Sequence, residues 1–281
     1  MPYPRPGAHT AAAHQLLTPR TPRVVGVRKL QRRRDREAAR RFLAEGPQAV
    51  REALAVPGLL RELFGTPDAL GRHAELAEAA PEVWPVTDEA LAGLAETVHP
   101  QGLVAVCDFL DAPLTMVAAA PPRLVAVLAE IRDPGNAGTV LRTADAAGAG
   151  AVVFAGDAVD PYNGKCVRAS AGSLFHLDVV RGGDAGHAIE ELRRGGLHIL
   201  AADAHGEVDL EEYADAGELR GRTAWVFGSE AHGLPSELAA AADARVRVPI
   251  HGRAESLNLA AAAAVCLYAS ARALRTPGAS P

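Results

Sequence analysis

The sequence predicts an α/β protein with a largely parallel sheet, and two observations support this fold class. From residue 123 onward, short apolar runs rich in Val, Ile and Leu alternate with longer amphipathic segments. Strands buried on both faces read as continuous apolar runs, and the connection between two parallel strands usually contains a helix. Several of the apolar runs end in polar loops that contain glycine. Such loops form ligand sites beyond the carboxyl ends of parallel strands.

A chain of 281 residues is long enough for two domains, each with its own core. We expect a disordered tail over residues 1–22, which is rich in proline and has no periodic apolar pattern. A small α/β domain over 23–112 follows, and then a linker over 113–122 that contains three prolines. The second domain spans residues 123–281.

In the small domain, residues 49–54 predict a helix because Ala49, Val50, Ala53 and Leu54 fall on one helical face. Residues 59–64, 70–80 and 87–95 read as alternating short strands and helices, and 103–106 as a final strand. In the second domain, strands are expected at 124–128, 151–154, 177–180, 197–201, 224–227 and 245–250. Helices are expected at 139–147, 165–171, 185–194 and 236–242, with a buried last helix at 257–274.

Charge is distributed unevenly along the chain. Between Met1 and Arg41 there are 11 Lys or Arg and 2 Asp or Glu, so this segment carries +9 and the remaining 240 residues carry −14. Such asymmetry indicates an arm that contacts a polyanion, with nucleic acid as the leading candidate. The alternative is a solvated arm without a partner.

Cysteine usage and hydropathy exclude several classes. Cys107, Cys166 and Cys266 are odd in number and widely spaced, which fits neither a disulfide framework nor a zinc site. The N-terminus has no signal-peptide core, and the longest apolar run, residues 259–269, is too short to span a bilayer. We expect a cytoplasmic protein with no membrane segment and no metal.

The common nucleotide motifs are missing, but polar residues follow two strands at useful positions. The dinucleotide glycine turn is absent, and Leu234 and Pro235 replace the Lys and Ser/Thr of a phosphate loop. Asn136, Thr139 and Arg142 are spaced at i, i+3 and i+6 through a helix start. Asn136 can cap this helix, and Arg142 would lie on roughly the same face.

Three sequence blocks carry a family resemblance. Residues 133–144 read Asp-Pro-Gly-Asn-Ala-Gly-Thr-Val-Leu-Arg-Thr-Ala, and residues 228–234 read Gly-Ser-Glu-Ala-His-Gly-Leu. Residues 248–260 read Val-Pro-Ile-His-Gly-Arg-Ala-Glu-Ser-Leu-Asn-Leu-Ala. Together, in this order, they resemble the SpoU (TrmH-like) family of RNA ribose 2′-O-methyltransferases over residues 124–274. The first domain is similar in layout to the ribosomal-protein-like substrate-binding domain often attached to this family.

The resemblance implies a C-terminal trefoil knot, an exception to the usual unknotted topology. It also implies a homodimer and an S-adenosylmethionine site in the knot. In this chain Gly228, Val248, Ile250 and Leu257 would hold the adenosyl part, because adenine fits an apolar slot with backbone donors and acceptors at its edge. The alternative for Val248 and Leu257 is an ordinary core position.

The reaction implied by the resemblance is methyl transfer to a ribose 2′-hydroxyl. Arg142 would stabilise developing charge on the attacking oxygen, since arginine stays protonated and is a poor base. Asn136 would position the ribose or Arg142, and Glu230 would order the knot loop or orient Arg142 from a partner subunit. Ser256 and Asn258 would bond near the methyl donor or cap the last helix. The general base stays unassigned.

The basic arm would neutralise RNA phosphates. The arginines proposed for this contact are Arg32, Arg33, Arg34, Arg36, Arg40 and Arg41. The sequence therefore predicts a methyltransferase acting on RNA, with 23S ribosomal RNA favoured over transfer RNA because of the added N-terminal domain. A non-catalytic RNA-binding module of the same fold and a nucleotide-binding enzyme with a small substrate are the rivals. Housekeeping and antibiotic-resistance roles are equally compatible with the sequence.

Overall fold

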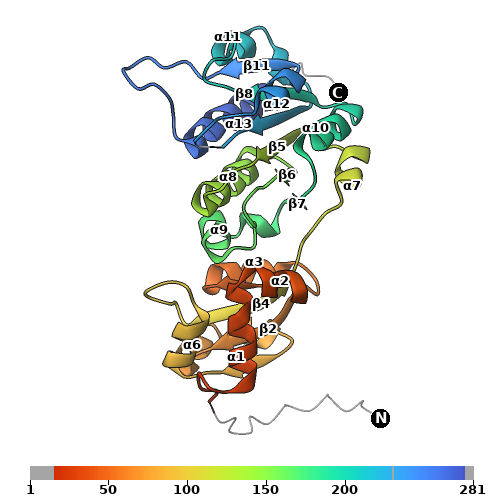
Figure 1. The fold of residues 1–281 in the computed structure, drawn as a ribbon. Helices are drawn as coiled ribbons and strands as arrows, with labels where there is room; N and C mark the ends of the chain where they lie inside the picture. Colours follow the sequence, from red (N-terminus) through yellow and green to blue (C-terminus); the bar gives the residue numbers. More distant parts are fainter. Residues whose placement is uncertain (1–15, 230, 276–281) are drawn as a thin grey trace.

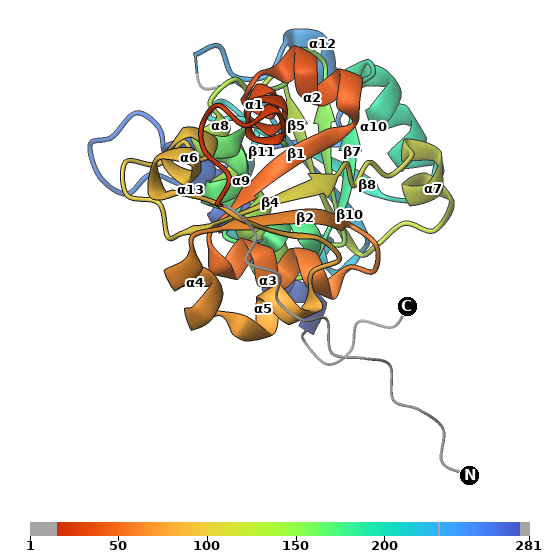
Figure 2. The ribbon, with the colours of Figure 1, turned by 90° about the horizontal axis from the view of Figure 1, so that it is seen from below.

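The computed structural model describes residues 16–229 and 231–275. Within these residues the chain forms two units, each built on its own sheet, with the N-terminal unit stacked against the C-terminal one (Figure 1). The sheet of the first unit has the strand order β1-β4-β2-β3, and that of the second has the order β7-β6-β5-β10-β8-β11-β9. Seen from below, the first unit lies in front of the second (Figure 2).

The N-terminal unit is a mixed sheet with short helices around it. Its strands are β1 (Arg41–Glu45), β2 (Leu60–Gly65), β3 (Val83–Pro85) and β4 (Leu103–Asp108). Its helices are α1 (Pro22–Arg28), the 3₁₀ turn η1 (Lys29–Gln31), α2 (Arg33–Ala39), α3 (Pro47–Ala55), α4 (Pro67–Arg72), α5 (Ala74–Ala79) and α6 (Asp88–Leu94). β4 pairs antiparallel with β1 and β2, whereas β3 is parallel to β2.

Two features of this unit differ from the sequence-based expectation. The expected tail is partly ordered, since Leu17 bridges to Val86 and its amide donates to the Pro85 carbonyl at 2.9 Å; residues 1–15 lie outside the described residues. Strand β1 was not expected, because the charged residues at its two ends, Arg41 and Glu45, interrupt the apolar signal. Phe42 and Ala44 nevertheless alternate inward, which is the period of a half-buried strand.

The C-terminal unit confirms the predicted α/β class with a parallel sheet. Its strands are β5 (Leu124–Ala129), β6 (Ala151–Ala155), β7 (Asp178–Arg181), β8 (His198–Ala202), β9 (Val208–Asp209), β10 (Thr223–Phe227) and β11 (Ala244–Arg247), and every neighbouring pair is parallel. Its helices and turns are α8 (Pro134–Ala147), α9 (Gly164–Ser170), η2 (Ser173–Phe175), α10 (Ala185–Arg194), α11 (Leu210–Asp215), η3 (Glu218–Arg220), α12 (Ser236–Ala241) and α13 (Leu259–Arg275).

Helices cover both faces of this sheet. One face packs against α8, α9 and α13, and the other against α10, α12 and α7 (Leu114–Ala119). Helix α7 lies in the segment expected to be a linker, and its Val117 is buried against the second face. The chain between the units is therefore packed rather than free, and the division at residues 113–122 stays a prediction.

Helices α8 and α9 approach each other closely because of one glycine. A Cβ atom at Gly138 would lie 2.4 Å from the Cys166 carbonyl oxygen and 2.6 Å from the Ala169 Cβ. Both distances are below van der Waals contact, so only glycine permits this spacing. The two helices consequently pack as one layer.

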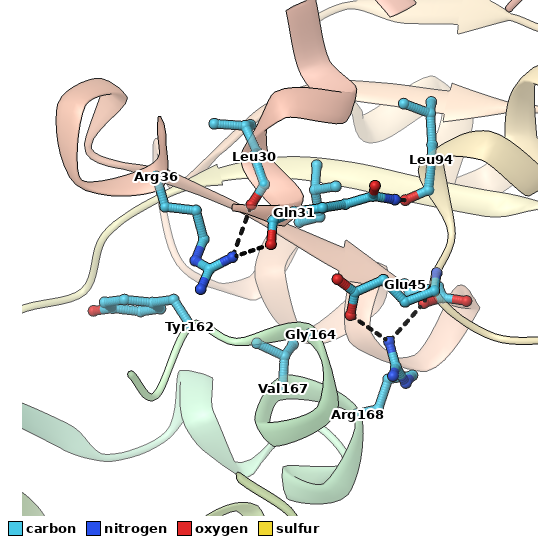
Figure 3. A pocket seen from close by; sticks show the side chains of 11 residues that line it. Leu30, Gln31, Arg36, Glu45, Leu94, Tyr162, Gly164, Val167 and Arg168 are labelled. Carbon is cyan, nitrogen blue, oxygen red and sulfur yellow. Dashed lines mark hydrogen bonds and ion pairs between the residues drawn. The ribbon is translucent and has the colours of Figure 1, made fainter. Parts of the chain in front are cut away.

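The two units share a continuous apolar core. Phe42 of β1 lies 4.7 Å, between ring centroids, from Tyr162, which precedes α9, and Tyr162 stacks on Phe109 at 4.1 Å. A cavity of about 10 Å³ lies at the junction (Figure 3), which is room for one water molecule at most. The interface is thus packed like a domain interior.

Ionic groups lie inside the same interface. Arg36 of α2 donates to the Asp160 Oδ2 through Nε at 2.9 Å and Nη2 at 2.7 Å, and both side chains are 3% exposed. Nη1 of Arg36 also donates to the carbonyls of Leu30 and Gln31 (Figure 3). Beside this pair, Arg181 binds Asp111 and Glu37.

These contacts shift the pKa values of nearby groups. Burial acts to raise the pKa of the Asp111 carboxyl, but hydrogen bonds from Arg181 and Tyr162 outweigh it and lower that pKa. Burial also raises the pKa of the Tyr162 phenol. Both groups therefore keep one protonation state through the neutral pH range.

Substituting Gly138 with alanine should destabilise the fold. The new methyl group would push α9 away from α8, and overpacking of this kind costs about 1–3 kcal/mol. Gly71→Ala is a matched control, because nothing lies within 4 Å of its added Cβ in α4 and alanine favours the helix by about 0.5–1 kcal/mol. Urea denaturation measures both; equal stability of the two variants would contradict the close packing of α8 and α9.

Stability should also depend on His176, which joins the two units. Its Nδ1 lies 2.8 Å from the Asp145 carboxylate of α8 and its Nε2 lies 3.2 Å from the Glu52 carboxylate of α3. The hydrogen bond to Asp145 raises the pKa of the His176 ring, and the hydrogen bond to Glu52 raises it by a smaller amount. The protonated ring therefore stabilises the folded state below the ordinary histidine pKa of about 6.5, and this contribution is lost as pH rises through the raised value.

We expect the stability difference between the wild type and His176→Gln to be largest near pH 6 and to shrink at higher pH. Urea denaturation at a series of pH values measures it. His187→Gln, at an exposed position of α10, serves as the control. A difference that grows with pH would show that the neutral ring, not the protonated one, stabilises the interface.

Candidate functional site

The candidate site lies at the carboxyl edge of the parallel sheet. From β5 the chain continues to β6 and β7, which extend the sheet on one side of β5. It then crosses to β8, which lies on the opposite side of the sheet, beyond β10. The strand order therefore reverses beside β5 and β10, which is where open α/β sheets bind ligands. The loops that follow β5, β10 and β11 carry the residues that the sequence singled out.

The loop after β5 leads into α8, which begins earlier than predicted. Asp133 is the N-cap, since its carboxylate accepts from the amides of Gly135 and Asn136 at 3.2 Å each, and Pro134 follows at the first helical position. The expectation that Asn136 caps this helix was wrong, because Asn136 already lies inside its first turn. Lys165 donates a hydrogen bond to Asp133. This bond is the largest of the effects that lower the pKa of the Asp133 carboxyl.

Arg142 is exposed on the same helix. It lies six positions after Asn136, which corresponds to about 9 Å along the axis and about 1.7 turns. The two side chains thus lie on neighbouring flanks of α8 and not on one face as the sequence analysis expected. Among the described residues no carboxylate pairs with the Arg142 guanidinium, so it is available to a charged ligand.

The loop after β10 is tightly folded. Gly228 leaves no room for a side chain, since a Cβ there would lie 2.2 Å from the Gly233 carbonyl carbon. Ser229 and Gly233 exchange backbone hydrogen bonds of 3.0 and 2.9 Å, which close the loop. Glu230, a candidate site residue, lies outside the described residues.

The loop between β11 and α13 is open to solvent. Val248 is half-buried, whereas Ile250 and Leu257 are 37% and 39% exposed. Ser256 is exposed and α13 starts at Leu259, two residues later than expected. Asn258 caps this helix, because its side chain accepts from the Ala260 amide at 2.9 Å. Leu257 is therefore a loop residue and not a core position.

One contact joins the first and third sequence blocks. The Asn258 side-chain nitrogen donates to the Asn136 side-chain oxygen at 3.4 Å. Two predicted site residues from segments 122 positions apart thus meet at the start of α8. Within residues 16–229 and 231–275 no contact brings Ser256 or Arg142 into this pair, so their parts in the site stay predictions.

The structure separates the six arginines proposed for RNA. Arg32, Arg33 and Arg34 are exposed around the start of α2, whereas Arg40 pairs with Asp111 and Arg41 pairs with Asp108. Arg36 does not fit the proposal, since it is buried and its guanidinium is used by Asp160 and two carbonyls. The sequence showed a uniform basic run and could not distinguish the inward side of α2.

Lys165 was missed by the sequence analysis. It lies at the start of α9, and its ammonium bonds to the Asp133 carboxylate at 2.6 Å. The signal for Asp133 was present in the sequence, because Asp followed by Pro is a common helix start. Nothing local in the sequence indicated that Lys165 reaches it.

Other classes of site receive no support from the described residues. In that part of the chain no group of His, Cys, Asp and Glu side chains is arranged to hold a metal ion. No helix there is long and apolar enough to cross a membrane.

The fold and the site define the class: an α/β protein whose ligand site lies at the carboxyl edge of an open parallel sheet, with an Arg-rich unit docked against it. The model of the SpoU rRNA Methylase family matches residues 123–268, and that of the MRM3-like substrate binding domain matches residues 21–105. The chain belongs to the SpoU rRNA methylase family, which confirms the resemblance seen in its sequence blocks.

Individual relatives agree along nearly the whole chain. The 23S rRNA (guanosine(2553)-2′-O)-methyltransferase RlmP of Bacillus subtilis is 32% identical over 90% of this chain and 98% of its own. The AdoMet-bound rRNA methyltransferase of Sinorhizobium meliloti is 31% identical, with a TM-score of 0.78 over 91% of this chain and 96% of that one. AviRb of Streptomyces viridochromogenes, in complex with AdoMet, is 29% identical with a TM-score of 0.78 over 90% of this chain and 98% of that one.

Asn258→Ala should lower the stability of the fold. It removes both the cap of α13 and the contact to Asn136, and loss of a cap alone costs about 1 kcal/mol. Ser256→Ala is the control, because Ser256 is exposed and does not cap the helix. Chemical denaturation compares them; equal losses would contradict the assignment of the cap to Asn258.

Proposed function

We propose that this protein is an S-adenosylmethionine-dependent methyltransferase that methylates a ribose 2′-hydroxyl of ribosomal RNA, with 23S RNA as the favoured substrate. The observation that carries the proposal is the meeting of Asn136 and Asn258 at the carboxyl edge of the sheet, which joins two blocks of the SpoU family pattern. The 23S methyltransferase of Bacillus subtilis, which matches over 90% of this chain and 98% of its own length, supports ribosomal RNA over transfer RNA.

The residues proposed for the cofactor fit its chemistry. The loop from Val248 to Leu257 presents apolar side chains to solvent, and within the described residues its backbone from 249 to 257 makes no hydrogen bond to other backbone groups. Apolar walls with free backbone donors and acceptors suit an adenine ring and its edge. Gly228, Val248, Ile250 and Leu257 would hold the adenosyl part, and the bound cofactor would supply the electrophilic methyl group.

Arg142 is assigned to the attacking ribose oxygen. Its guanidinium is exposed and has no carboxylate partner among the described residues, so it can approach an RNA phosphate or a developing alkoxide. Asn136 and Asn258 form an amide pair that can orient the ribose beside it. Glu230 and Ser256 remain candidates for the same site, and the general base is left unassigned.

The N-terminal unit would bind the substrate. Its match to the MRM3-like substrate binding domain supports this role, and Arg32, Arg33 and Arg34 present their charges to solvent. Arg40 and Arg41 stay in the proposal beside these three residues. Each is paired with a carboxylate, but its side chain is partly exposed and can also contact RNA. Exposed arginines of this kind neutralise RNA phosphates.

A homodimer and a C-terminal knot complete the proposal. Ala261, Val265, Tyr268 and Arg272 form an exposed stripe along α13, and Val265 and Tyr268 are 42% and 53% exposed. Apolar side chains at helical spacing on an open face favour burial against a second copy.

The three buried thiols, Cys107, Cys166 and Cys266, suit a reducing compartment and support a cytoplasmic location.

The decisive experiment is methyl transfer from labelled S-adenosylmethionine into ribosomal and transfer RNA from cells lacking this protein. We expect the wild type to label ribosomal RNA at a ribose. Arg142→Ala should lose about 10²–10³ in rate, as for a lost oxyanion-hole donor, while it still binds cofactor. Labelling of transfer RNA alone would change the substrate class, and RNA binding without labelling would favour a non-catalytic module.

A further inference from the structure

A chain of contacts connects the N-terminal unit to the start of α8. It begins at the buried Arg36–Asp160 pair, which joins α2 to the loop between β6 and α9. Asp160 also orders its own loop, since its Oδ1 accepts from the Tyr162 amide at 2.9 Å and its carbonyl accepts from the Asn163 amide at 3.0 Å. Docking of the N-terminal unit therefore holds the loop that leads into α9.

The same loop supports the segment before α8. The Val159 amide donates to the Ile131 carbonyl at 2.7 Å, so the loop after β6 is bonded to the loop after β5. Asn163 caps α9 by accepting from the Lys165 amide at 2.9 Å, which fixes the backbone position of Lys165 at the start of the helix. Both contacts lie next to the first turn of α8.

Lys165 makes the last contact in this series. Its ammonium bonds to Asp133 at 2.6 Å, and the two oxygens of Asp133 accept from the Gly135 and Asn136 amides. A Cβ at Gly135 would lie 2.9 Å from the Lys165 Cε, so the glycine leaves space for the lysine stem against the helix. The turn that carries Asn136 is thus held from α9 as well as from its own cap.

We propose that Lys165 and Arg36 are positioning residues for methyl transfer: docking of the N-terminal unit through Arg36 orders the loop before α9, and Lys165 then holds the Asn136 turn of α8 in its working geometry. The inference rests on the proposed function of the site. It assigns the N-terminal unit a second role besides RNA binding, because its presence fixes the catalytic helix. The close packing at Gly138 keeps α8 and α9 together while this happens.

The first test uses Lys165→Met, which keeps the stem and removes the charge. We expect the single-turnover methylation rate at saturating RNA to fall roughly ten- to a hundredfold, since small misplacements of a reacting group cost about that much. Binding of S-adenosylmethionine and the KM for RNA should stay unchanged, and Lys165→Arg should restore most of the rate. Arg194→Met is the control, because it breaks an exposed ion pair with Glu191 on the opposite face of the sheet.

A rise in the KM for RNA with an unchanged rate would overturn the proposal, since Lys165 would then contact RNA directly. An unchanged rate and KM would also overturn it. The proposal would also be overturned if Lys165→Met lost rate and Lys165→Arg recovered none of it. The positive charge would then have no part in the effect.

Amide hydrogen exchange tests the positioning without catalysis. In Lys165→Met, and in Arg36→Met or the milder Arg36→Lys if the former does not fold, the amides of Gly135, Asn136 and Ala137, which are bonded to Asp133, should exchange faster than in the wild type. Exchange unchanged at these residues overturns the inference, whatever the enzyme's activity. Absence of wild-type methylation with faster exchange in the variants would instead refute the proposed function and leave the structural coupling supported.

Discussion

The arrangement of this molecule depends on one buried ion pair, between Arg36 and Asp160. Removing two charges from water is expensive, and the cost is offset only when every donor finds an acceptor. Here the guanidinium meets a carboxylate and two backbone carbonyls, and the carboxylate also accepts from a backbone amide. The pair is therefore satisfied only when both units are docked in one register, which makes the relative position of the units specific.

The docked state has consequences for the charges around it. Arg36 turns inward from α2 while Arg32, Arg33 and Arg34 remain outside, so a single basic run supplies both an anchor and an exposed cluster. Because the anchor is rigid, the exposed cluster is held at a fixed distance from the carboxyl edge of the larger sheet. A substrate bound to both must match that distance, which is a constraint of shape and not of base sequence.

The sequence predicted the larger unit well because its signals are strong there. Strands such as β5 and β10 are buried on both faces and read as unbroken apolar runs, and these were placed within a residue or two. Strand β1 was missed because Arg41 and Glu45 at its ends interrupt the apolar signal. The inward turn of Arg36 was missed for a different reason, since a buried arginine is defined by its partner Asp160, 124 residues away.

The same distinction explains the site. Asn136 and Asn258 were found from their motif blocks, and their contact could not be deduced because it depends on how α8 and α13 pack. Helix starts were less certain: Asp133 and Asn136 are both good caps, and the choice between them is made by Pro134 and by Lys165, which favours a carboxylate. The residues proposed for the chemistry can thus be found from the sequence, whereas the residues that hold them in place can be identified only from the packing of α9 against α8.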